Sequence, residues 1–192
     1  MNRAVFLWAG ALAVALAGLA GCVPVMVAGA VGGTAMVATD RRSAGAQVDD
    51  EAIELKLSSK IGTDYETRAH VNVTSFNGVV LITGEVPDQE ALTFIGNLAK
   101  GTEKVRVVHN ELVVGPNSDL SSRSNDTYIT GKVKSRMIEA NKFPPNAVKV
   151  VTERGVVYLM GLVSKEEGDA AAEIAATTSG VVRVVKFFQY PT

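Results

Sequence analysis

The pattern of apolar and polar residues runs through this chain twice. Residues 71–86 align with residues 148–163 at a constant offset of 77, and seven valine or glycine positions are identical in the two segments. The register continues into Val-Arg-Val-Val, which occurs at 105–108 and again at 182–185. Upstream, residues 50–61 match residues 126–137 at an offset of 76, so the intervening loop differs by one residue between the copies. The sequence therefore predicts two copies of one small domain.

Each copy is predicted to begin with a helix, because its apolar residues recur every four positions. In the first copy they are Ile53, Leu57 and Ile61, and in the second they are Ile129, Val133 and Met137. Short polar residues of the kind that favour helix N-caps stand just before these runs. They are Asp49 and Asp50 in the first copy, and Asn125 and Asp126 in the second. We expect the two helices to begin there.

A β-hairpin is predicted after the first helix of each copy. Alternating valines lead into Asn77-Gly78 or Arg154-Gly155, and Asn-Gly is a favoured two-residue turn because both positions tolerate positive φ. The returning strand, 79–83 or 156–160, is apolar almost throughout, which indicates burial on both faces or a central place in the sheet. A second helix follows, and a valine-rich strand at 105–113 or 182–188 ends the copy.

The order αββαβ in both copies predicts an α+β fold. Each of the two tandem domains is expected to have a three-stranded mixed sheet with two helices packed on one face. The domains are placed at 46–115 and 124–192, and a polar linker rich in turn formers joins them at 116–123. Residues 22–45 begin with mostly Val, Ala and Gly and show neither helical nor strand periodicity, so they are interpreted as a flexible tether.

Residues 1–21 have the layout of a secretory signal peptide. Arg3 carries the one charge before an uncharged apolar run at 5–19, which is shorter than the roughly 20 residues of a membrane-spanning helix. The run ends in Leu19-Ala20-Gly21-Cys22, which contains the single cysteine and resembles a bacterial lipobox. The resemblance implies that Cys22 is acylated and begins the mature chain, held on a membrane by its acyl chains. An ordinary signal peptide with a chance cysteine is the alternative.

Charge and composition argue against several functional classes. Without residues 1–21 the chain has 18 Lys and Arg against 20 Asp and Glu, and a net charge of −2 argues against nucleic-acid binding. The sequence has no nucleophile motif, so neither an enzyme nor a cofactor is predicted. The two histidines, His70 and His109, lie in the predicted first and last strands of one domain. No metal site is predicted, because no Cys, Asp or Glu at ligand spacing accompanies them.

The first helix of the second copy is basic, whereas that of the first copy is acidic. Residues 123–142 contain five basic and two acidic residues, and residues 49–68 contain three basic and six acidic residues. At about 100° per residue Tyr128 points away from the core face with Lys132 beside it, which suits an anionic membrane surface. The predicted phospholipid-binding residues are Tyr128, Ile129, Lys132, Val133, Lys134 and Arg136. The alternative is that Tyr128 packs on the other domain or the linker and the lysines form a solvated face.

The motif Val-x-Val-x-x-x-x-Gly-Val-Val-x-Leu/Ile-x-Gly-x-Val, followed by a helix and a valine-rich strand, resembles the BON domain. Two such units after a lipobox resemble the dual-BON lipoproteins of the outer membrane. The resemblance implies a non-enzymatic protein that binds anionic phospholipid, such as phosphatidylglycerol or cardiolipin, and supports outer-membrane integrity, including at division sites.

The lipobox resemblance implies a location, and the residues leave an alternative role open. Val23, in place of Asp, after the lipobox cysteine implies the inner leaflet of the outer membrane, facing the periplasm. The alternative function is that of a scaffold for an envelope protein complex, with the basic helix as a protein interface.

Overall fold

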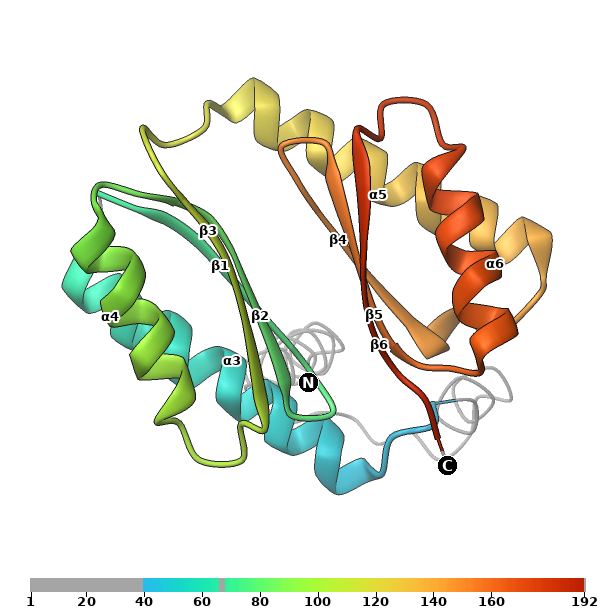
Figure 1. The fold of residues 1–192 in the computed structure, drawn as a ribbon, viewed down its shortest axis with the longest axis horizontal. Helices are drawn as coiled ribbons and strands as arrows, with labels where there is room; N and C mark the ends of the chain where they lie inside the picture. Colours follow the sequence, from blue (N-terminus) through green and yellow to red (C-terminus); the bar gives the residue numbers. More distant parts are fainter. Residues whose placement is uncertain (1–39, 66–67, 192) are drawn as a thin grey trace, which may run out of the picture. The chain divides into compact units, whose positions relative to one another are not determined.

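The computed structural model describes residues 40–65 and 68–191, and in them the order αββαβ occurs twice. The first copy consists of α3 (Ala44–Tyr65), β1 (His70–Phe76), β2 (Val79–Val86), α4 (Gln89–Lys100) and β3 (Val107–Val114). The second consists of α5 (Leu120–Ala140), the 3-10 turn η2 (Pro145–Ala147), β4 (Val148–Glu153), β5 (Val156–Leu162), α6 (Lys165–Ala176) and β6 (Arg183–Gln189). In each copy both helices cover one face of the sheet (Figure 1). The predicted fold class is confirmed.

The hairpin places the second strand of each copy at the centre of its sheet. The strand orders are β1-β2-β3 and β4-β5-β6, with the first pair antiparallel and the second pair parallel. The turn residues have the positive φ values that a two-residue hairpin needs: 51° and 73° at Asn77 and Gly78, and 53° and 73° at Arg154 and Gly155. The predicted hairpins and the central strands are therefore confirmed.

The central strand β2 is buried at all eight of its positions, because its two faces meet different partners. Successive side chains of a strand point to opposite faces. Val80, Ile82 and Val86 pack with Leu57 of α3 and Ile95 of α4 in the core of the first domain. The core of the second domain is built in the same way, from Val157, Leu159, Ile129, Val133 and Ile174 among others.

The other faces of β2 and β5 share a third apolar cluster, which joins the two domains. Phe76, Val79 and Leu81 of the first domain pack there with Tyr158 and Met160 of the second. The ring of His109 on β3 stacks on Phe187 of β6, with 3.7 Å between the centroids and 15° between the planes. The apolar character of β2 and β5 therefore reflects both interpretations offered for it, a central place and burial on both faces.

The predicted N-caps of α3 and α5 are wrong, because both helices begin earlier. Asp119 is the N-cap of α5, where its side chain accepts a hydrogen bond from the Ser122 amide. Asp50 and Asp126 lie inside their helices and are 2% and 5% exposed. Each carboxylate reaches the hairpin turn of its own domain instead.

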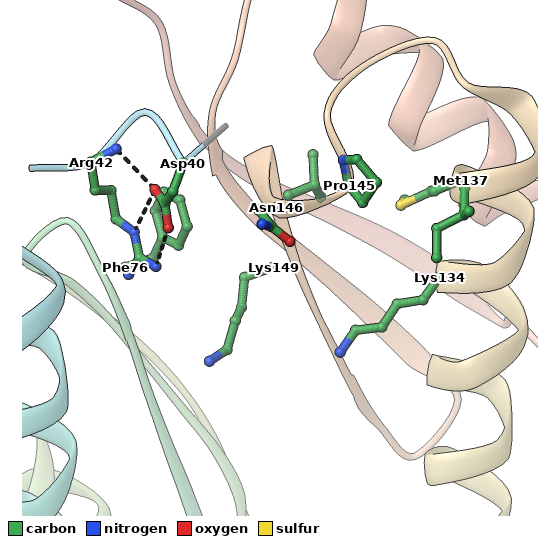
Figure 2. Close-up of a pocket in the computed structure, with 10 residues that line it drawn as sticks. Asp40, Arg42, Phe76, Lys134, Met137, Pro145, Asn146 and Lys149 are labelled. Carbon is green, nitrogen blue, oxygen red and sulfur yellow. Dashed lines mark hydrogen bonds and ion pairs between the residues drawn. The ribbon is translucent and has the colours of Figure 1, made fainter. Parts of the chain in front are cut away.

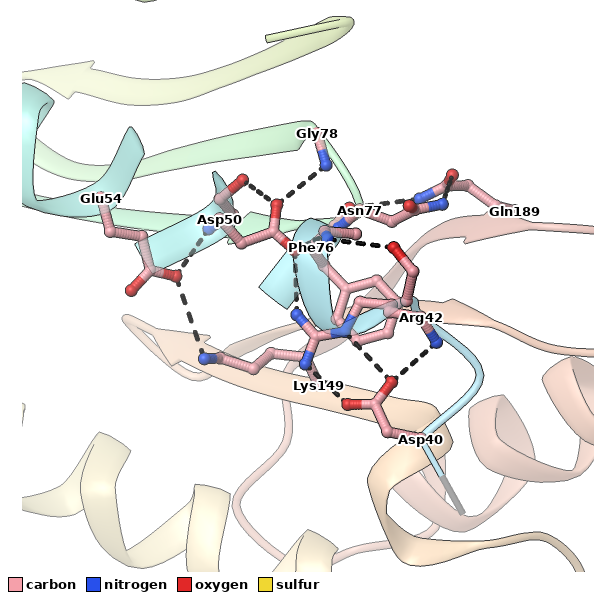
Figure 3. A network of polar contacts seen from close by, with 12 residues as sticks. Asp40, Arg42, Asp50, Glu54, Phe76, Asn77, Gly78, Lys149 and Gln189 are labelled. Atoms are coloured by element: carbon pink, nitrogen blue, oxygen red, sulfur yellow. Dashed lines mark hydrogen bonds and ion pairs between the residues drawn. The ribbon is translucent and has the colours of Figure 1, made fainter. Parts of the chain in front are cut away.

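The turn contacts are equivalent in the two domains. Asp50 accepts hydrogen bonds from the amides of Asn77 at 2.6 Å and Gly78 at 2.8 Å (Figure 3). Asp126 accepts from the amides of Arg154 and Gly155, both at 2.8 Å. A buried carboxylate is thus satisfied by turn amides that would otherwise lack partners. These two contacts tie the first helix to the hairpin.

The chain before α3 is held in place as far back as Asp40. Arg42 pairs with Asp40 and with Asp50, at 2.8 and 2.9 Å, and lies over the Phe76 ring (Figure 3). Arg41 makes a bidentate pair with Glu167 of α6, at 2.6 and 2.7 Å. The prediction of a flexible tether is therefore wrong for residues 40–45. The predicted signal peptide at 1–21, Cys22 and the tether up to residue 39 lie outside the described residues.

Two further boundaries differ from prediction. Helix α5 begins at Leu120, so it includes the second half of the predicted linker at 116–123. Strand β2 continues through Gly84 to Val86 and does not end at the glycine. Among the helices of residues 40–65 and 68–191, none is long and apolar enough to cross a membrane.

Candidate functional site

Helix α5 carries all six predicted lipid-binding residues, but its packing divides them into three groups. Ile129 and Val133 are 1% and 0% exposed and belong to the core of the second domain. They form the apolar stripe, at positions i and i+4, that holds the helix against its sheet. The prediction that these two residues contact lipid is wrong, because both side chains are buried in the core.

Tyr128 and Lys132 form an exposed pair on one flank of α5. Tyr128 is 65% exposed, so its ring does not pack in the contact between the domains. Lys132 Nζ lies 5.1 Å from the centroid of this ring, in a cation-π arrangement. The same ammonium group donates to the carbonyl oxygen of Ser179, in the loop after α6. The pair therefore has a fixed position on the surface.

Arg136 lies one turn further along this flank and binds the end of α6. Its guanidinium donates to the carbonyl oxygen of Ile174 at 2.9 Å and to the hydroxyls of Thr178 and Thr177 at 2.6 and 3.1 Å. A cation is favourable at the C-terminus of a helix, where carbonyl groups lack amide partners. Arg136 therefore fixes α5 against α6.

The flank of α5 that faces α6 is hollowed. The hollow has a volume of about 530 Å³, and its lining includes Tyr128, Lys132, Ser135, Arg136 and Ser179. It combines an aromatic ring, two cations, the Glu139 carboxyl group and hydroxyl groups at the surface of one domain. We call this surface, defined by Tyr128, Gly131, Lys132, Ser135, Arg136 and the loop 177–179, the α5 flank.

Lys134 points to the opposite side of the helix and lies in a different hollow. This second hollow, of about 340 Å³, is lined by Phe76 of the first domain and by Met137, Ile138 and Lys149 of the second (Figure 2). Lys149 Nζ lies 3.9 Å from Glu54 Oε1, so part of its charge is balanced within the molecule. The six predicted residues thus do not form one surface, and only Tyr128, Lys132 and Arg136 share the α5 flank.

The two histidines lie apart on the first sheet. His109 stands opposite Leu81 on β2 and His70 stands opposite Glu85, four residues further along that strand. Burial lowers the pKa of His109, whose ring is covered by Phe187. The lowered pKa favours the neutral form of the imidazole.

His70 has acidic neighbours that the sequence argument missed. One ligand atom each from His70, Glu85 and Glu153 lies within 4.8 Å of the others. The prediction considered only Cys, Asp and Glu at ligand spacing in the sequence. Glu85 lies on the neighbouring strand and Glu153 comes from the other domain, so that spacing did not indicate them. The internal repeat offered a signal, since Glu85 and Glu153 correspond at an offset of 77 to Leu162 and Phe76.

The chain thus consists of two αββαβ domains, which pack against each other through the sheet faces that their own helices do not cover. The BON domain matches residues 49–116 and 125–192, and the chain belongs to this family. It is similar to Outer membrane lipoprotein DolP of Haemophilus influenzae, with 40% identity over 174 residues, which is 90% of either chain.

Two other relatives are also similar over most of the chain. The 21 kDa hemolysin of Actinobacillus pleuropneumoniae is 38% identical over 79% of this chain and 79% of its own. Osmotically-inducible protein Y of Escherichia coli is 30% identical over 71% of this chain and 70% of its own.

Proposed function

We propose that this chain is a lipid-anchored lipoprotein of the outer membrane that binds anionic phospholipid through the α5 flank. The observation that carries the proposal is the exposed Tyr128 ring with the Lys132 ammonium 5.1 Å from its centroid. The similarity to Outer membrane lipoprotein DolP over 90% of both chains supports the location. Cys22, in its lipobox, is the proposed site of acylation.

The physical basis is that the acyl anchor and the α5 flank contribute different terms to membrane binding. Two or three acyl chains at about 0.8 kcal/mol per buried CH₂ keep a protein on a bilayer, but they do not distinguish among headgroups. An aromatic ring at headgroup depth gives interfacial affinity, and each nearby cation contributes about 1 kcal/mol at an anionic surface. Selectivity for anionic lipid therefore belongs to α5, and residence on the membrane belongs to Cys22.

The proposed role is non-catalytic, and it places the protein at the inner leaflet, facing the periplasm. The proposed ligands there are the anionic phospholipids phosphatidylglycerol and cardiolipin. Binding to such lipid would support outer-membrane integrity, including at division sites. None of the three relatives has a name that denotes an enzyme.

Vesicle co-sedimentation tests the proposal on a chain that lacks residues 1–22, so that no acyl chain contributes. The unmodified sequence should sediment with phosphatidylglycerol vesicles and stay in solution with phosphatidylcholine vesicles. Tyr128→Ala and Lys132→Gln should each lower the bound fraction several-fold, because each removes one half of the aromatic and cationic pair.

The chain itself offers two matched controls. Tyr190→Ala removes another exposed tyrosine, which is 52% exposed near the C-terminus, and Lys134→Gln removes a cation from the opposite side of α5. Both should bind nearly as well as the unmodified sequence. If all four variants bind alike, the α5 flank is not the lipid site. If no form binds vesicles, the alternative of an envelope protein scaffold is favoured.

A further inference from the structure

A buried cluster of three ionisable side chains lies where the two domains meet. His70 is the first residue of β1, Glu85 lies on β2, and Glu153 is the last residue of β4. His70 Nδ1 is 3.3 Å from Glu85 Oε2 and 3.9 Å from Glu153 Oε1. The side chains of Glu85 and Glu153 are only 3% and 7% exposed, so water screens their charges poorly.

The repeat shows that the fold does not require polar residues at these positions. At the offset of 77, His70, Glu85 and Glu153 correspond to Ala147, Leu162 and Phe76. All three counterparts are apolar. Leu162 and Phe76 occupy the equivalent places on β5 and β1, and Ala147 ends the turn η2 just before β4. Charges at these three positions are therefore not needed to build the domain.

Hydrogen bonds to one oxygen of each carboxylate fix the orientation of the group. Glu153 Oε2 accepts from the side chains of Asn72 at 2.9 Å and Thr83 at 3.2 Å. Glu85 Oε2 accepts from the Ser118 amide at 3.0 Å. The other oxygen of Glu85, Oε1, is buried and has no hydrogen-bond partner among the described residues.

An oriented carboxylate with a buried, unpartnered oxygen is costly unless a cation neutralises it. The nearby carboxylate of Glu153 adds to this cost, because its ligand oxygen lies within 4.8 Å of that of Glu85. Hydrogen bonds to one carboxylate oxygen are also how proteins orient metal ligands from outside the coordination sphere. The cluster thus has the ligands and the supporting contacts of a metal site.

We infer that His70, Glu85 and Glu153 bind a divalent transition-metal ion, with Zn²⁺ as the best fit. Bonds of about 2.0–2.2 Å in tetrahedral geometry separate neighbouring ligand atoms by roughly 3.3–3.6 Å. His70 Nδ1 lies 3.3 Å from Glu85 Oε2 and 3.9 Å from Glu153 Oε1. One imidazole and two carboxylates are a zinc-type donor set, and a water molecule would complete the coordination. A hollow lined by His70, Asn72, Arg123 and Glu153 gives access to it.

The ion would act as a clip between the domains. Two ligands come from the first domain and the third comes from the second, so binding requires both sheets in their docked arrangement. Since metal binds the docked form only, it should stabilise the whole molecule by mass action. This role is independent of the α5 flank and of lipid binding.

The test is a titration of the EDTA-treated full chain, in detergent, with Zn²⁺ alone. Calorimetry should show one ion bound per chain, and the thermal midpoint should rise with Zn²⁺ concentration. Glu153→Gln keeps an acceptor for Asn72 and Thr83 but removes the charge, and it should weaken Zn²⁺ binding by about 100-fold or more, exceeding a supporting contact's effect. His109→Gln removes the other histidine and should leave binding unchanged.

A second readout separates a ligand from a merely structural residue. Without metal, Glu153→Gln should raise the thermal midpoint, because it removes one of two like charges. Addition of Zn²⁺ should not raise the thermal midpoint of this variant further. If the wild-type chain binds no Zn²⁺, or if Glu153→Gln binds Zn²⁺ as tightly as the wild type and His109→Gln do, the inference is overturned. The wild-type titration still tests the metal-binding inference if a variant fails to fold.

Discussion

At the residue scale, the hydrogen-bond partners of two aspartates could not be predicted from the sequence. Asp50 and Asp126 stand at the start of an apolar helical pattern, where Asp is a preferred cap. Their true partners are turn amides 27 to 29 residues further along the chain. The sequence predicts the helix and the turn separately, but no local preference indicates that one binds the other. The residues at 44–49 and 120–125 are compatible with helix, so both helices begin before the predicted start.

Asp126→Ala should lower the free energy of unfolding by about 2–3 kcal/mol, because two turn amides lose their buried acceptor. Asn125→Ala alters the other predicted cap, which is exposed, and should change stability by less than about 0.5 kcal/mol. Urea denaturation of both variants measures the difference. Equal, small effects would contradict the assignment of Asp126 to the turn.

At the scale of elements, the periodicities identify the helices and strands, and tertiary contacts decide how far each one runs. Gly84 and Gly161 resemble strand ends in the sequence, yet both strands continue past them. A Cβ at Gly161 would lie 2.4 Å from the Ala147 carbonyl oxygen, and one at Gly84 would lie 1.9 Å from that of His70. The glycines are there because the neighbouring strand approaches closely.

The segment before α3 gives another example at this scale. Its apolar, small residues predict a tether, but its last part is fixed by ion pairs to both domains. Hydrogen bonds from Arg41 lower the pKa of Glu167, a residue that also completes the capping box of α6 with Ser164. Local composition gives no sign of this, because Glu167 lies 126 residues away.

Arg41→Ala should lower the free energy of unfolding at pH 7 by about 0.2–1 kcal/mol, as expected for an ion pair near the surface. Because the folded state depresses the pKa of Glu167, the stabilisation is present above the ordinary Glu value of 4.5 and is lost as the pH falls below it. Urea midpoints at pH 7 and pH 3 measure this.

A matched control uses a neighbouring pair on the same helix. Lys165→Ala removes an exposed i,i+4 partner of Asp169, 3.6 Å away, and should have little effect at either pH. A loss in Arg41→Ala that is equally large at pH 3 would show that the pair with Glu167 is not its source.

At the scale of the molecule, the two domains act as one unit through their sheets. The sequence predicts both domains and indicates that β2 and β5 are buried on two faces. It does not indicate that these faces meet each other, because the contact joins two strands of one repeated motif and leaves no pattern of its own. The predicted lipid site was incomplete for a related reason, since a single helical wheel could not show which flank α6 covers.

Leu81→Glu places a charge in the apolar cluster shared by the domains and should free them to reorient. Residual dipolar couplings should fit one alignment tensor in the wild type and two different tensors in the variant. Leu55→Glu, at a residue 73% exposed on α3, should leave one tensor. A single tensor in Leu81→Glu, with both domains still folded, would contradict docking through this cluster.

A chemical-shift map of the unacylated chain, titrated with phosphatidylglycerol micelles, tests directly whether the α5 flank binds anionic lipid. Helix α3 serves as an internal control, because it occupies the equivalent place in the first domain but is acidic. If the α5 flank binds lipid, the largest shifts should occur at the amides of Tyr128, Gly131, Lys132 and Ser135 and in the loop 177–179, with α3 unaffected. Shifts centred on α3, or none along α5 at saturating lipid, would contradict lipid binding by this flank.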